Sequence, residues 1–298
     1  MLALQRRQET LANNIANVNT PGFKEDEGVL RAFPEQLISR IRDQEGPSVK
    51  GYPDPTGQPV MIGRLNTGVY MPEALANFNQ GDIQQTDNPY DLALLDNIKD
   101  VRGDGRRLFF SVARLENPEQ AALPEDIRYT RNGQWQVNEQ GYLVTADGYY
   151  VLDNDDRAIR VNDPDGKVAG RDLVIGNDGV LYLPEKEGLI TDPQNPVHRL
   201  GPIISLKVIT DPNQLVKEGA NIYRWAGEGQ PANALADPDL EGFYGVKQGW
   251  VERSNVNAAQ AMTDMMTVLR AYEANQRVIT TLDGTMEKAA NEIGRVNG

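Results

Sequence analysis

The sequence predicts an α+β fold, in which a mainly antiparallel β domain is flanked by N- and C-terminal α-helices that pair as a coiled coil. Apolar residues repeat at helical spacing at both ends of the chain. Between the ends, turn signals such as Asn132-Gly133 and Asp147-Gly148 separate short runs rich in Val, Ile, Leu and Tyr. The 298-residue chain has a net charge of −13, of which −12 falls in residues 51–249, with 18 basic and 30 acidic side chains.

The C-terminal segment, residues 250–298, is predicted to form one long helix that belongs to an inner core. We expect this helix to run from Ala258 to Asn291, about 50 Å, with Ser254 or Asn255 as its N-cap. Counting heptads from the first methionine of the helix places apolar side chains at eight of ten a and d positions. We assign to an assembly seam the residues Met262, Met265, Leu269, Tyr272, Ile279 and Met286.

The N-terminal segment, residues 1–42, is predicted to be the shorter helical counterpart of the C-terminal one. It should end before Pro21, because a proline disfavours the helical conformation of the residue before it. A second apolar stripe between Leu30 and Ile41 predicts another short helix. We expect the first stripe to pack against the C-terminal seam, within one chain or between copies; it consists of Leu4, Leu11, Ile15 and Val18.

The remaining residues divide into a linker and a domain. Residues 43–75 are dense in glycine and proline and are expected to form an extended linker without a core of its own. Residues 76–249 are expected to form a β-rich outer domain, because turn signals recur at about ten-residue spacing. No helix-length periodic segment interrupts these runs, which argues against a parallel βαβ sheet.

Composition excludes several classes of function. The acidic surface disfavours nucleic acid, because a phosphate backbone must be met with basic side chains. The chain has no cysteine and one histidine, His198, in a loop, so we expect no metal ligands, no cofactor-binding residues and no catalytic residues. The apolar runs are too short to cross a bilayer, and residues 1–20 lack the apolar region of a secretory signal peptide.

Four segments then point to a family. The segment Asn13 to Lys24 resembles the N-terminal signature of the bacterial flagellar rod and hook proteins, and Gln248 to Asn257, followed by Arg270 to Gln276, resembles their C-terminal signature. Tyr129 to Trp135, with the following Glu139 to Tyr149, and Gln80 to Ala93 resemble parts of the family's β domain. The size of the chain and its single modest β domain resemble the distal rod protein and its close rod-protein relatives more than the hook protein. The residues that carry the two terminal signatures are Asn13, Asn14, Asn17, Asn19, Gly22, Phe23, Ser254, Asn255, Asn257, Arg270 and Asn275.

The resemblance implies a structural axial subunit of the flagellar basal body that polymerises through its terminal helices into the distal rod. The implied partners are other copies of the chain, neighbouring rod and hook proteins and the flagellar export apparatus, with no small-molecule substrate. The implied location is the basal body in the cell envelope, reached by type III export without a cleaved signal peptide. That route would account for the missing signal peptide.

Two other classes of protein remain open from the residues alone. One is a cell-wall-directed, carbohydrate-active β domain on a helical stalk, which would need two carboxylates close together in a cleft. The other is a β-module adhesin on a stalk. A stalk needs one helix or hairpin, whereas apolar seams at both ends of the chain favour a subunit that assembles through them.

Overall fold

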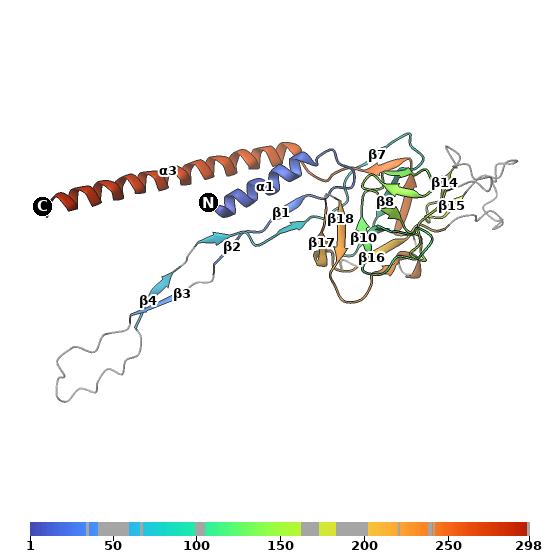
Figure 1. Ribbon diagram of the computed structural model, residues 1–298, viewed down its shortest axis with the longest axis horizontal. Coiled ribbons are helices and arrows are strands. Elements are labelled where there is room, and N and C mark those ends of the chain that lie inside the picture. The colour runs from blue at the N-terminus through green and yellow to red at the C-terminus, as the bar shows by residue number, and fades with distance from the viewer. Residues whose placement is uncertain are drawn as a thin grey trace, which may run out of the picture. The chain divides into compact units, whose positions relative to one another are not determined.

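The computed structural model describes residues 1–33, 36–40, 60–65, 68–98, 105–161, 173–182, 202–219, 221–237, 240 and 242–296. His198 and residues 99–104, half of the 96–107 loop, lie outside these ranges. The chain divides into two compact units (Figure 1). The first unit comprises Met1–Leu11, Glu27–Leu75 and Thr263–Gly298, and the second comprises Ala12–Asp26 and Ala76–Met262.

The second unit is built on an antiparallel sheet, as the sequence predicts, with nine strands among the described residues. Its central strand β9 pairs with β10, β13 and β16, and every residue of β9 is buried. The strands of this sheet are β9 (Arg107–Ala113), β10 (Ile127–Thr130), β11 (Trp135–Val137), β12 (Leu143–Thr145), β13 (Tyr150–Val151), β16 (Leu206–Ile209), β17 (Leu215–Lys217), β18 (Ile222–Trp225) and β19 (Ala232–Asn233).

Strand β9 separates two apolar clusters, because successive side chains of a strand point to opposite faces. Phe110 faces the larger cluster, where its ring lies 4.8 Å from that of Trp135. Phe109 faces the smaller cluster, where its ring lies 5.4 Å from that of Phe78. A strand that is buried on both faces reads as a continuous apolar run, which is what Leu108–Val112 shows around one serine.

Smaller antiparallel pairs complete the second unit. Strand β8 (Leu92–Asp96) pairs with β20 (Tyr244–Gln248), and β7 (Ile83–Gln85) pairs with β21 (Trp250–Glu252). These two pairs bring the segment that begins the β domain beside the segment that leaves it. The remaining elements among the described residues are β14 (Val174–Ile175), paired with β15 (Leu181–Tyr182), and the short 3-10 helices η2 (Pro212–Gln214) and η3 (Ala234–Ala236).

The short helix expected between Leu30 and Ile41 is wrong, because the described residues of this range include two strands and no helix. Its backbone pairs with residues 20 to 39 positions later, and that pairing overrides a helical period read from a short window. Three strands of the expected linker supply the partners. The pairs are β1 (Asp26–Gly28) with β6 (Ala74–Ala76), β2 (Arg31–Ala32) with β5 (Val69–Tyr70), and β3 (Gln36–Arg40) with β4 (Val60–Leu65).

Among the described residues two α-helices lie near the ends of the sequence, and the long C-terminal one is confirmed. Helix α1 spans Leu2–Ala16, and α3 spans Ala258–Val296. The expected N-cap, Ser254 or Asn255, is two or three residues too early: Asn257 caps α3 through its side-chain oxygen, which accepts from Gln260 N at 3.2 Å. The side chain of Asn255 instead binds the backbone of Glu25 and Asn77.

Candidate functional site

The four sequence motifs converge in the second unit on one buried carboxylate, Glu252. Its backbone carbonyl accepts a hydrogen bond from Gly22 N at 2.7 Å, and its side-chain Oε1 accepts from Gly81 N at 2.9 Å. Its other oxygen, Oε2, lies 3.6 Å from Nη1 of Arg131. Glu252 therefore touches the N-terminal motif, the segment that begins the β domain and the central β motif at once.

Glu252 is one of four buried charged side chains that lie close together, and we call them the ion network: Lys24, Asp96, Arg131 and Glu252. Lys24 Nζ lies 2.6 Å from Glu252 Oε1 and donates to the carbonyl of Asn79 at 2.8 Å. Arg131 donates to the carboxylate of Asp96. Two cations and two anions thus balance one another, which is the condition under which charges can be buried.

The network is tightly enclosed and incompletely hydrogen-bonded. Burial lowers the pKa of Lys24 from 10.5 to about 8, and the neighbouring Glu252 opposes that shift, so Lys24 stays charged at neutral pH. Oε2 of Glu252 and Nη1 of Arg131 have no hydrogen-bond partner, since 3.6 Å exceeds hydrogen-bond distance. The Arg131 guanidinium also stacks over the ring of Phe109, 5.3 Å from its centroid.

Two glycines permit the close approach of backbones in this region. Gly22 has φ of +69°, and a Cβ there would lie 2.5 Å from the backbone nitrogen of Asn132. A Cβ at Gly133 would lie 1.6 Å from the carbonyl oxygen of Leu92. Neither space accommodates a side chain, so these glycines of the first and third motifs are required by packing.

Two asparagines hold the N-terminal strand by paired hydrogen bonds. Asn14, fully buried, donates through Nδ2 to the carbonyl of Asp26 at 2.9 Å and accepts from Asp26 N at 3.0 Å. Asn255 accepts from Glu25 N at 2.7 Å and donates to the carbonyl of Asn77 at 2.8 Å. Each site needs one donor and one acceptor on the same side chain, which a carboxylate cannot supply.

The other signature residues have varied positions. Phe23 is fully buried, and Nζ of Lys217 lies 4.4 Å from its ring centroid. Asn17 donates to the carbonyl of Asn13 at 2.9 Å, and the hydroxyl of Ser254 accepts from Val256 N at 3.3 Å. The structure thus brings Asn14, Gly22, Phe23 and Asn255 together. The signature side chains that it leaves on the surface are Asn13, Asn19, Asn257, Arg270 and Asn275.

The seam residues fall into two groups by exposure. Leu11 is buried, while partial burial is shared by Leu4, Ile15, Val18, Met265, Leu269 and Tyr272. Met262, Ile279 and Met286 are 51%, 45% and 70% exposed. The most buried positions of α3 are Ala261 and Val268, each one residue before an expected a position, so the covered face is rotated relative to the predicted seam.

Further along α3 an apolar face stays open. We call Ile279, Leu282 and Met286 the exposed α3 stripe, since they follow one another at helical spacing and are 45%, 56% and 70% exposed. Val278 lies beside them and is 57% exposed. Pairing of the terminal helices as a coiled coil stays a prediction.

The ion-network residues Lys24, Arg131 and Glu252 lie within the sequence motifs, but the motifs predicted no role for them. The available signal was their position: each charged residue stands in a motif beside residues that the fold buries, such as Phe23 and Val251. Their partner Asp96 lies at the end of β8 and carries no such signal.

Two other kinds of site are absent from the part of the chain that the structure describes. It contains no group of three His, Cys, Asp or Glu side chains placed to hold a metal ion. It also contains no helix whose length and apolar character suit a membrane span.

Comparison with known proteins defines the class. The family model for the flagellar basal body rod protein matches residues 1–24, and that for the C-terminal region of the rod proteins FlgE, FlgF and FlgG matches residues 247–292. The model for the D1 domain of the same flagellar hook and rod proteins matches residues 102–183. Lys24 and Glu252 lie in the first two of these regions, so the buried ion pair joins the family's two terminal segments.

Several similar proteins bear the names of basal-body components, and this chain matches them over nearly their whole length. The hook-basal body complex protein FlhO of Bacillus subtilis is 35% identical over 296 residues, covering 99% of this chain and 96% of that protein. The rod proteins FlgG of Caulobacter vibrioides and Borreliella burgdorferi are 31% and 30% identical, each covering at least 96% of this chain and 94% of the relative. The chain belongs to the bacterial flagellar rod and hook protein family and is a structural component of the flagellar basal body. None of these relatives' names describes an enzyme.

Proposed function

We propose that this chain is an axial subunit that polymerises with copies of itself through its terminal helices into the rod, at its distal part. The observation that carries the proposal is the exposed α3 stripe, whose three side chains are about half exposed or more. Completing the burial of such side chains contributes roughly 1 kcal/mol each, and a helical assembly would repeat that gain at every subunit. An apolar helix face of this length favours a neighbouring copy as its cover.

The distribution of charge supports the same arrangement. Residues 1–50 carry seven basic and seven acidic side chains, and residues 250–298 carry five and six. Residues 51–249 carry 18 and 30. The acidic middle segments of two copies, residues 51–249, repel one another, whereas the nearly neutral ends do not. Association through the ends is therefore favoured.

The ion network has a supporting role in this proposal. It joins the segment that follows α1 to the segment that precedes α3, by the 2.6 Å contact of Lys24 with Glu252 and the 2.7 Å bond of Gly22 to the same residue. Both segments belong to the second unit, so this unit offers a common base for the two ends of the chain. Because these two segments are already held in the monomer, assembly loses less conformational entropy in ordering them.

The further partners follow from membership of the family. Neighbouring rod and hook proteins would adjoin the assembled subunits, and the flagellar export apparatus would deliver the chain without a cleaved signal peptide. The names of the relatives, rod protein and hook-basal body complex protein, support contacts of this kind and an axial position.

The proposal is tested by electron microscopy of the concentrated chain together with a double substitution, Leu269→Asp and Ile279→Asp. We expect tubes or stacks for the natural sequence and monomers for the variant, because carboxylates on the seam would be buried without partners. A matched control, Leu123→Asp, changes a residue of the second unit that is 58% exposed and should assemble normally. Normal assembly of the double variant would overturn the proposal.

A further inference from the structure

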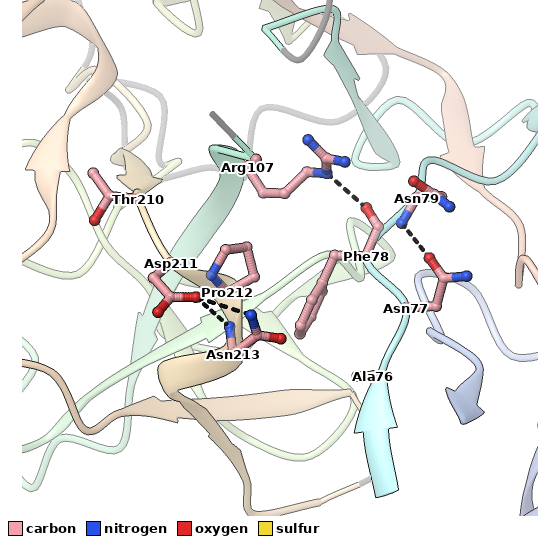
Figure 2. Close-up of a pocket in the computed structure, with 10 residues that line it drawn as sticks. Ala76, Asn77, Phe78, Asn79, Arg107, Thr210, Asp211, Pro212 and Asn213 are labelled. Carbon is pink, nitrogen blue, oxygen red and sulfur yellow. Dashed lines mark hydrogen bonds between the residues drawn. The ribbon is translucent and has the colours of Figure 1, made fainter. Parts of the chain in front are cut away.

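A pocket of about 460 Å³ opens in the second unit beside the start of β9 (Figure 2). The segment after β6 forms one wall, with Phe78 and two asparagines, and the segment around η2 forms another, with Asp211 and Asn213. Arg107 lies in the pocket lining although only 8% of its surface is exposed. The pocket therefore contains a nearly buried guanidinium.

The charge of Arg107 is not balanced within the described part of the chain. Its Nε donates to the carbonyl of Phe78 at 3.0 Å and its Nη1 donates to the carbonyl of Arg106 at 2.8 Å, and both acceptors are neutral. The acid of the pocket, Asp211, is engaged by the backbone of Asn213 at 3.1 Å and by Gln214 at 3.2 Å. No carboxylate of a described residue lies within ion-pair distance of Arg107.

The other buried cations make this arrangement unusual. Among the described residues four basic side chains are buried: Lys24, Arg107, Arg131 and Lys207. Three of them have a carboxylate within ion-pair distance, and Arg107 does not. A buried cation without a counter-ion is costly, and a guanidinium forms its strongest hydrogen bonds to a carboxylate. The missing partner is thus a carboxylate, and the pocket gives it access.

We propose that this pocket receives an acidic side chain from the second unit of a neighbouring copy of the chain. This inference rests on the proposed self-assembly for its occupant, while the pocket's affinity for a carboxylate stands on the geometry alone. Charge complementarity favours a copy: residues 51–249 carry 30 acidic side chains against 18 basic ones, so a neighbour's surface is rich in carboxylates. A contact of this kind turns one repulsion between acidic units into an attraction and sets their register.

The affinity of the pocket is measured on the full chain at low concentration, by NMR of nitrogen-labelled arginine guanidinium groups. Sodium acetate is the probe, with sodium chloride at equal ionic strength as its control. We expect a saturable shift of the Arg107 Nε resonance with acetate alone. The substitution Thr210→Glu, at an exposed residue that lines the pocket, should supply an internal carboxylate and abolish that shift. An acetate shift equal to the chloride shift overturns the proposal.

The occupant is tested by the concentration at which the chain assembles. Arg107→Gln should raise that concentration by about tenfold, and Arg107→Lys, which keeps the charge, should raise it less. Arg106→Gln, at the adjacent residue whose partner Asp237 lies 3.4 Å away, serves as the control and should leave it unchanged. Acetate binding with unchanged assembly of Arg107→Gln would show that the occupant is not a copy. Acetate binding in a chain that never assembles would refute both the occupant and the proposed function, while leaving the pocket's affinity established.

Discussion

The contribution of the ion network can be isolated by the substitution Glu252→Gln. Glutamine keeps the shape of the side chain and one oxygen that can accept from Gly81 N, but it removes the charge that faces Lys24 at 2.6 Å. Removing one partner of a buried ion pair costs about 3–5 kcal/mol. Lys24 can release its proton once its counter-ion is gone, which limits the loss, so we expect about 3 kcal/mol less stability.

The assay is urea unfolding of the full chain, followed by the fluorescence of its three tryptophans, one of which, Trp135, is fully buried in the second unit. The matched control is Glu218→Gln. Glu218 also faces two cations, Arg128 at 2.5 Å and Arg224 at 2.7 Å, but on the surface. Surface pairs contribute about 0–1 kcal/mol, so the control should change stability little.

The comparison separates burial from pairing. Equal losses for the two variants, or a loss below about 1 kcal/mol for Glu252→Gln, would refute the reasoning that burial makes this network important. A change in the slope of unfolding free energy with urea would instead show that the variant alters the folded or unfolded ensemble, and the slope is therefore compared as well.

Two further predictions concern Gly22 and Lys24, which both contact Glu252. Gly22→Ala should lower the free energy of unfolding by at least about 2 kcal/mol, because φ is +69° and the new Cβ would lie 2.5 Å from Asn132 N. Thermal unfolding measures this loss, and an unchanged midpoint would contradict the prediction. The free energy of unfolding should also rise by up to about 3 kcal/mol between pH about 8 and 10, relative to Lys24→Met. Burial lowers the pKa of Lys24 from 10.5 to about 8, so in this range the unfolded chain binds more protons than the folded chain. Urea unfolding as a function of pH tests this below the range in which Tyr129, whose pKa is raised to about 12, has the opposite effect. A flat difference between the two chains would contradict it.

The sheet and the long helix could be predicted because local sequence determines them. Asp147-Gly148 forms a turn with Gly148 at φ +80°, and the runs on either side of it become β12 and β13. In α3 the absence of proline and the apolar repeat act within the segment itself. Such signals need no knowledge of distant residues.

The errors lie where a distant segment decides the structure. Residues 36–40 form a strand because residues 60–65 pair with them, and the local apolar spacing contains no trace of that partner. Asn255 was a reasonable helix cap by type, but Glu25 N and the carbonyl of Asn77 engage its side chain. The ion network has the same origin, since Lys24 and Glu252 are 228 positions apart in sequence.

The proposal that copies assemble through α3 is tested most directly by cysteine protection, since the chain has no cysteine of its own. Single cysteines replace Ile279 or Met286 of the exposed α3 stripe, and Leu123 of the second unit as the control, all at least 45% exposed. Maleimide labelling is then timed in the monomer and in the assembled sample. We predict that assembly slows labelling at the two α3 positions by at least about tenfold and changes Leu123→Cys little, because of these three positions only the two on the stripe become buried. Labelling of the stripe at its monomer rate in assembled samples would contradict the account.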